Sequence, residues 1–217
     1  MSVKASVAAE SAVDRIRSRP WGLAVAVVAG DETSILLDQG DDKFDEDTYF
    51  QIGSVTKTMT GLLLADLVVR GEVSLDATVG SVLGAETGVC GPITLLELAT
   101  QNSGLPRLPP NLRHEDIDEA NPYSSYSEAK LIEALGRVDQ LKPGYAYSNF
   151  GFMLLGLLIS RISGSSYAEL AKQRIFDPLG MKAVCGIPRD EERLPGYEGS
   201  SQMPCWTTQL PGAGGIA

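Results

Sequence analysis

Ser54 and Lys57 have the residue types and the spacing of a nucleophile and its base. A serine hydroxyl is a weak nucleophile near neutral pH and needs a proton acceptor within hydrogen-bond reach. Residues three apart lie on one face at the start of a helix, so the Lys57 amine can approach the Ser54 oxygen. Burial beside apolar neighbours such as Leu62 would favour the neutral amine, the form that accepts a proton. We therefore expect acyl transfer with Ser54 as nucleophile and Lys57 as general base, and the helix N-terminus adds oriented N–H groups where an oxyanion would form.

The same spacing recurs at Ser127 and Lys130, which offers a comparison within the chain. Ser127 follows a loop and precedes an amphipathic segment, so helix capping accounts for it. Ser54 instead follows Gly53 and precedes a segment that is apolar almost all round, where an exposed lysine is not expected. For Lys57 the alternative of a surface lysine with a buried stem stays open.

Tyr147 and Asn149 form the second candidate pair. In an extended segment, residues two apart point to the same side, where a phenol can relay a proton and an amide can hold a substrate carbonyl. The alternative is a plain helix start, with Ser148 or Asn149 as the cap.

Hydrophobic periodicity predicts a helix, a hairpin and then a mainly helical body. The first helix is expected over residues 3–17, and the hairpin strands over 22–29 and 34–38. The first strand is apolar on both faces, which predicts a place inside a larger sheet. No strand is expected from Pro178 onward. Further helices are expected over residues 55–70, 94–100, 127–137, 150–162 and 167–176.

Composition excludes several classes of protein. The 217 residues carry a formal charge of -10, which argues against nucleic acid or an anionic membrane as a partner. Three scattered cysteines indicate neither a disulfide framework nor a zinc site, and no metal or cofactor is expected. The single histidine, His114, lies in a polar loop and no G-x-S-x-G motif accompanies it, so a Ser-His-Asp triad is not indicated. The N-terminal segment lacks the apolar region of a signal peptide, so a cytoplasmic location is expected unless a leader has been removed.

Four segments in a fixed order carry a family resemblance. They are FQIGSVTKTMTGLLLADLVVRGEVSLD, ITLLELATQNSGLP, PGYAYSNFGFMLLGLLISRISG and FDPLGMKAV. Together they resemble the serine β-lactamase and penicillin-binding protein superfamily, in the branch of class C β-lactamases, D-alanyl-D-alanine carboxypeptidases and related serine esterases. The resemblance implies an α+β, β-lactamase/transpeptidase-like fold. It also implies an acyl-enzyme on Ser54, activation by Lys57, Tyr147 as a partner base and Asn149 as a substrate-binding residue.

The chain departs from the family pattern in two places. The third family motif, K-T-G or H-x-G on a strand, is not found, because Lys142-Pro143-Gly144 precedes Tyr147 and a proline cannot sit in a central strand. The other is Gln101-Asn102-Ser103-Gly104, where many relatives have a histidine before Ser-Gly. The expected arrangement is an N-terminal helix and hairpin over residues 1–50 and a helical catalytic region over 51–217. The C-terminal sheet strands would be missing from this chain, and another chain is a possible source of them.

The leading hypothesis is a serine hydrolase that acts on a small-molecule ester, amide or β-lactam. A carboxylesterase is slightly favoured over a β-lactamase or a D-Ala-D-Ala carboxypeptidase, because no export signal is visible. The alternative is a catalytically inactive binding or regulatory protein, or a truncated fragment that needs another chain for activity.

Overall fold

The computed structural model describes most of the chain, in two compact units. The first unit comprises Met1–Phe50 with Arg189–Met203, and the second comprises Gln51–Pro188 with Pro204–Ala217. The division into an N-terminal region to residue 50 and a catalytic region after it stays a prediction. His114 lies outside the described residues. Those residues are 5–16, 21–40, 43–112, 118, 121–186, 194, 196–198 and 201–217.

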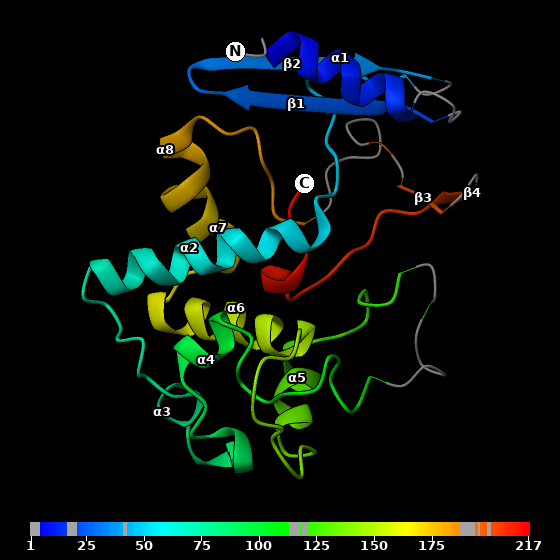
Figure 1. Ribbon diagram of the computed structural model, residues 1–217. Coiled ribbons are helices and arrows are strands. Elements are labelled where there is room, and N and C mark those ends of the chain that lie inside the picture. The colour runs from blue at the N-terminus through cyan, green and yellow to red at the C-terminus, as the bar shows by residue number, and fades with distance from the viewer. Residues whose placement is uncertain are drawn as a thin grey trace. The chain divides into compact units, whose positions relative to one another are not determined.

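The first unit contains a helix packed on a hairpin (Figure 1). Helix α1 covers Ala5–Ile16, and it contacts both strand β1, Leu23–Ala29, and strand β2, Glu32–Asp38. The strands pair antiparallel from Leu23 opposite Asp38 to Ala29 opposite Glu32. The two-residue turn starts with Gly30, whose φ of 62° suits a hairpin turn with glycine first. The predicted helix and hairpin are confirmed, with the second strand starting two residues earlier because the turn is this short.

Two expectations for the strands were wrong. Strand β1 pairs only with β2 in the part of the chain that the structure describes, so it does not lie inside a larger sheet there. A second hairpin follows Pro178, with β3 over Gly196–Glu198 and β4 over Ser201–Met203. Strands of three residues are too short to show the alternation by which strands are predicted. Completion of a sheet by another chain stays a prediction.

The second unit is built around two long helices that lie side by side, α2 over Thr56–Val69 and α6 over Asn149–Ser163 (Figure 1). Both are strongly apolar, and α6 buries ten consecutive residues, Phe150 to Ile159. The predicted helices are confirmed to within two residues at most ends. Around α2 and α6 lie α3 (Val79–Leu83), η2 (Ala85–Cys90), α4 (Leu95–Ala99), α5 (Glu128–Leu135), α7 (Tyr167–Ala171), η4 (Lys172–Phe176) and α8 (Asp177–Leu179).

A buried polar row on α2 faces the C-terminal turn η6, Pro211–Ala213. Thr56, Lys57 and Thr60 are all buried on this side of the helix. The Thr60 hydroxyl donates to the Gly212 carbonyl at 2.7 Å. Because its hydrogen is used there, the Tyr167 phenol donates to the Thr60 oxygen, also at 2.7 Å. This row therefore attaches the C-terminal turn to the helix that begins just after Ser54.

Helix α6 holds the other side of that turn through a contact between two glycines. A Cβ on Gly156 would lie 2.9 Å from the Gly212 Cα, a separation that no side chain tolerates. Gly61, in the middle of α2, has nothing within 4 Å of its Cβ position. The two helical glycines therefore differ in their surroundings. Gly156 permits close packing against η6, whereas the space around Gly61 would accommodate a side chain.

This difference predicts opposite effects of alanine. Gly156→Ala should destabilise the protein by about 1–3 kcal/mol, because the added methyl group overpacks the contact with the turn. Gly61→Ala should be neutral or stabilise it by up to about 1 kcal/mol, because alanine has the higher helix propensity. Urea unfolding of both variants measures the difference, and equal stabilities would contradict the close contact.

Candidate active site

Ser54 lies exposed in a short turn that leads into α2. The turn is the 3₁₀ helix η1, Gly53–Val55, which runs directly into α2. Gly53 has a φ of 51°, a left-handed conformation that glycine adopts without strain. The Ile52 N–H donates to the Ile216 carbonyl at 3.1 Å, which anchors the start of the turn. The Ser54 N–H is in the first turn of the helical segment, where backbone donors have no intrahelical acceptor.

Lys57 is buried, with 8% of its surface exposed, and its Nζ atom points at Ser54. The Nζ atom donates to the Ser54 Oγ at 3.1 Å and to the Ala213 carbonyl at 2.7 Å. It also lies 4.9 Å from the centroid of the Tyr147 ring and 5.7 Å from that of Phe152. A surface lysine is therefore the wrong interpretation of Lys57.

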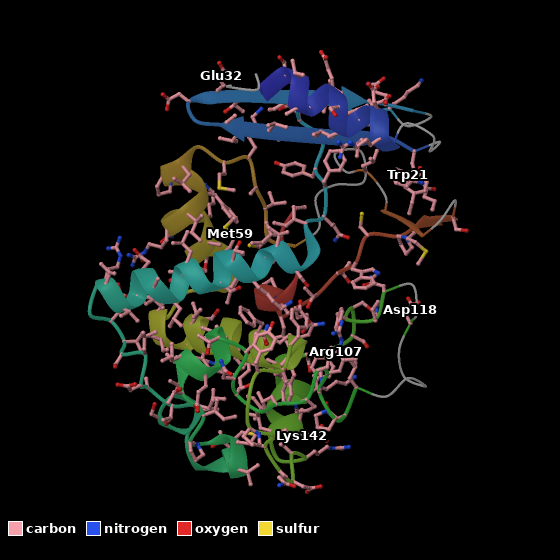
Figure 2. The ribbon with its side chains drawn as sticks, viewed as in Figure 1. Trp21, Glu32, Met59, Arg107, Asp118 and Lys142 are labelled. Atoms are coloured by element: carbon pink, nitrogen blue, oxygen red, sulfur yellow. The ribbon has the colours of Figure 1, made fainter. Side chains whose placement is uncertain are left out.

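Tyr147 contacts the other side of the Ser54 oxygen. Its phenol donates to the Ser54 Oγ at 2.7 Å. The Arg107 guanidinium carbon lies 5.2 Å from the Tyr147 ring centroid, and Figure 2 labels this side chain. Partial burial alone would raise the pKa of Tyr147, but Lys57, the Ser54 hydroxyl and Arg107 together hold that pKa below the ordinary value of tyrosine. Tyr147 therefore loses its proton to form the phenolate more readily than a free tyrosine does.

Asn149 is the first residue of α6, and Ser148 is its cap. The Ser148 hydroxyl accepts from the Gly151 N–H at 2.9 Å, which settles the capping alternative in favour of Ser148. Asn149 lines the same cavity as Ser54. Its Oδ1 atom is buried and has no hydrogen-bond partner among the described residues. An unsatisfied buried amide oxygen at a cavity wall is suited to a hydrogen-bond donor on a ligand.

The cavity beside Ser54 has a volume of about 80 Å³. Trp206 is half-exposed at its edge and meets the Tyr123 ring edge to face, with the centroids 5.8 Å apart. The backbone of Trp206 is held by Gln51 through two hydrogen bonds, of 2.6 and 2.9 Å. The lining is mostly apolar and consists of Gly53, Ser54, Tyr123, Asn149, Met153, Trp206, Thr208, Leu210, Ala213 and Gly214.

Residues 12–216 match the Beta-lactamase family. The chain belongs to the beta-lactamase family. Among curated proteins it is similar to the D-alanyl-D-alanine-carboxypeptidase/endopeptidase AmpH of Escherichia coli K12, at 33% identity over 184 residues. That match covers 78% of this chain and 46% of the relative. Beta-lactamase-like protein 2 of Dictyostelium discoideum is 32% identical over 154 residues, 67% of this chain and 27% of the relative.

Solved structures place this family member in the same fold. A class C beta lactamase from Rhodobacter sphaeroides superposes with a TM-score of 0.76 at 29% identity, over 98% of this chain and 60% of that structure. A beta-lactamase/D-alanine carboxypeptidase from Yersinia pestis gives 0.78 at 25% identity, over 97% and 65%. The fold is therefore β-lactamase/transpeptidase-like, rich in helices and poor in strands, and the family resemblance of the sequence is confirmed. The chain spans less than two thirds of the length of these relatives.

Several residues around the candidate site of this beta-lactamase family member were not predicted. Ala213 contributes only its carbonyl oxygen, which leaves no signature in the side-chain pattern. Arg107 lies in an irregular segment with no motif of its own. Trp206 lies outside the four family segments, and no role followed from its position in the sequence. Ser127 caps α5, as predicted for the second copy of the Ser-Lys spacing.

Two negative findings concern the described residues of this family member. They include no group of three or more histidine, cysteine, aspartate or glutamate side chains placed to hold a metal ion. Among them, no helix has both the length and the apolar character needed to cross a bilayer.

The charges around Tyr147 lead to a prediction that needs no substrate. Arg107→Gln should raise the pKa of the Tyr147 phenol, because it removes one of the positive charges that stabilise the phenolate. Tyrosine labelled with ¹³C at the ring carbon that bears the hydroxyl, followed by NMR against pH, reports this pKa directly. Arg137→Gln removes the same group from the exposed pair with Glu133 and should leave the Tyr147 titration unchanged. If Tyr147 has the same pKa in the wild type and in both arginine variants, the proximity of Arg107 is contradicted.

Proposed function

We propose that the chain is a serine hydrolase of ester or amide bonds, β-lactam-like ones included, acting through an acyl-enzyme on Ser54 with Lys57 as general base. The observation that carries this proposal is the convergence of two proton-transfer groups on one oxygen. Lys57 Nζ lies 3.1 Å and the Tyr147 phenol 2.7 Å from the Ser54 Oγ. Because the chain spans only part of its relatives, the activity of the whole protein is part of the proposal.

In the proposed acylation, the neutral Lys57 amine takes the proton of the Ser54 hydroxyl as Oγ attacks the substrate carbonyl carbon. The developing oxyanion lies near the Ser54 N–H, a backbone donor free for this use. When the tetrahedral intermediate collapses, the bond to the leaving group breaks. The leaving alcohol or amine takes a proton from the Tyr147 phenol, which leaves a Tyr147 phenolate beside the Lys57 ammonium. The product is an ester between Ser54 and the acyl group.

In the proposed deacylation, the Tyr147 phenolate is the base. Its neighbours lower the pKa of Tyr147 and so favour the form that accepts a proton from water. The water oxygen attacks the acyl-enzyme carbonyl and the water proton passes to Tyr147. The bond to Ser54 Oγ then breaks, and the Lys57 ammonium returns its proton to Ser54, which restores the starting state. The sum of both steps consumes one water and releases one acid and one alcohol or amine.

The cavity supports a small acyl group as the part of the substrate bound next to Ser54. A cavity of about 150 Å³ holds a benzene molecule, and the space here is about 80 Å³. Met153, Leu210 and the rings of Tyr123 and Trp206 provide apolar contacts, while Asn149 provides an unsatisfied oxygen for a substrate donor. This combination favours a short acyl chain that bears, or lies next to, an N–H or O–H group.

The chain carries its own matched control for the nucleophile. Ser54→Ala should abolish both turnover of p-nitrophenyl butyrate and the covalent adduct with a fluorescent penicillin, and Lys57→Ala should slow both by about 10²- to 10⁴-fold. Ser127→Ala alters the second Ser-Lys pair and should keep full turnover while losing about 1 kcal/mol of helix capping. Intact-mass analysis with peptide mapping locates the adduct.

Unchanged hydrolysis by Ser54→Ala would show that Ser54 is not the nucleophile. No adduct and no turnover, in a chain shown to unfold cooperatively, would support the alternative of an inactive binding protein or of a chain that needs another for activity.

The size of the cavity predicts a preference among esters. For the wild type, kcat/KM should be higher for p-nitrophenyl acetate and butyrate than for the octanoate, because the longer chain does not fit beside Ser54. Trp206→Ala should reduce the ratio of kcat/KM between the short esters and the octanoate by roughly tenfold. It removes one wall of the cavity, while the backbone contacts to Gln51 remain. Trp21→Ala, the other tryptophan, does not line the cavity and should leave the preference unchanged. A preference that Trp206→Ala leaves intact would contradict the assignment of this cavity to the acyl group.

A further inference from the structure

Gln101 has a strained backbone beside the segment that carries Tyr147. Its φ is 61°, and it is the one non-glycine residue with a positive φ among the described residues. A left-handed conformation costs a non-glycine residue of order 1 kcal/mol, and such strain collects at functional sites. Gln101 is nonetheless buried, with 8% of its surface exposed.

Part of this conformation has a purely local explanation. Helix α4 ends at Ala99, with Thr100 as its cap. Gln101 donates its N–H to the Leu98 carbonyl at 3.2 Å, and Asn102 donates to the Glu97 carbonyl at 2.8 Å. This pair of bonds is the Schellman ending of a helix, which requires a left-handed residue at the position of Gln101. Glycine is the usual residue there, so the helix ending accounts for the backbone but not for the choice of glutamine.

The side chain of Gln101 supplies the missing reason. Its Oε1 atom accepts from the backbone N–H of Ser148 at 2.8 Å. Its backbone carbonyl accepts from the N–H of Ala146 at 2.9 Å. One residue therefore holds both chain neighbours of Tyr147, through its side-chain oxygen and its backbone carbonyl.

The surrounding chain leaves this segment little freedom to adopt another position. A Cβ on Gly104 would lie 2.8 Å from the Lys142 carbonyl, so the two segments are in direct backbone contact. The Lys142 N–H donates to the Gly104 carbonyl at 3.0 Å, and the Asn149 N–H donates to the Arg107 carbonyl at 2.9 Å. Within this frame, Gln101 provides the contacts that directly flank Tyr147.

We propose that Gln101 is a positioning residue for Tyr147: its side-chain oxygen and its carbonyl clamp Ser148 and Ala146, and so aim the phenol at the Ser54 oxygen. Ser148 is fully buried, so its N–H has no water to replace a lost acceptor. Without the side chain, the segment relaxes and the 2.7 Å contact between Tyr147 and Ser54 lengthens. This inference rests on the proposed function for its effect on rate, and on geometry alone for its effect on the Tyr147 titration.

The decisive variants are Gln101→Gly and Gln101→Met. Glycine removes the side chain and relieves the left-handed backbone, which offsets the cost of the lost hydrogen bond to Ser148, so the thermal stability should change little. Methionine keeps the length of the side chain but has no oxygen to accept from Ser148. Both variants should lower the second-order rate of Ser54 acylation by roughly tenfold to 10²-fold, the scale of a small misplacement of a reacting group. Gln101→Glu keeps the acceptor oxygen and should recover most of the rate.

A double-mutant cycle tests whether Gln101 acts through Tyr147. In a Tyr147→Phe background, Gln101→Gly should cost less than twofold in the acylation rate, because there is no phenol left to misplace. In the ¹³C-tyrosine titration, Gln101→Gly should raise the pKa of Tyr147 toward the ordinary value as the phenol moves away from Lys57. The proposal would be overturned if Gln101→Gly acylates Ser54 at the wild-type rate. It would also be overturned if the substitution lowers the acylation rate equally with and without the Tyr147 phenol.

The two proposals can fail separately. If the wild type forms no acyl-enzyme, the proposed function fails, but the titration still decides on Gln101. A titration of Tyr147 that Gln101→Gly and Gln101→Met both leave unchanged would overturn the positioning role whatever the activity.

Discussion

The rest of the candidate site depends on how the chain provides hydrogen-bond partners for the amine of a buried lysine. An amine that is removed from water needs hydrogen-bond partners in fixed places, because an unsatisfied one costs several kcal/mol. Lys57 has two such partners, the Ser54 hydroxyl and the Ala213 carbonyl. The same two bonds therefore stabilise the fold and place the proposed proton acceptor beside the proposed nucleophile. Removing either partner would disturb both the stability of the fold and the position of the Lys57 amine.

This constraint explains why the C-terminal turn is held so firmly. Ala213 can serve Lys57 only if its carbonyl is fixed, and the chain fixes it from two sides. Thr60 binds Gly212 from α2, while Gly156 allows α6 to approach Gly212 without a side chain between them. The Ile216 N–H adds a longer contact of 3.3 Å to Thr56. The site is thus assembled from α2, the start of α6 and a turn that is remote from both in sequence.

The parts of this arrangement that lie within one helix could be predicted from the sequence. The buried helix after Ser54, a cap at Ser148 or Asn149 and the cap at Ser127 follow from local spacing and capping rules that require no knowledge of the tertiary structure. The Ala213 carbonyl could not be found, because a backbone oxygen looks the same at every residue. The strain at Gln101 was also hidden, since a helix ending predicts glycine there. Strands β3 and β4 were missed because three residues carry too little periodicity.

The bond between Lys57 and Ala213 joins residues 156 positions apart. During synthesis the N-terminal part of a chain emerges first, so helix α2 is made long before the turn that accepts its amine. Until Ala213 has left the ribosome, Lys57 has only one of its two hydrogen-bond partners, and the polar row of α2 lacks its cover from η6. The proposed nucleophile and its base are thus made early, but their geometry is completed late. If the proposal holds, a nascent chain that ends before residue 213 contains Ser54 and is still inert until the fold around it has closed.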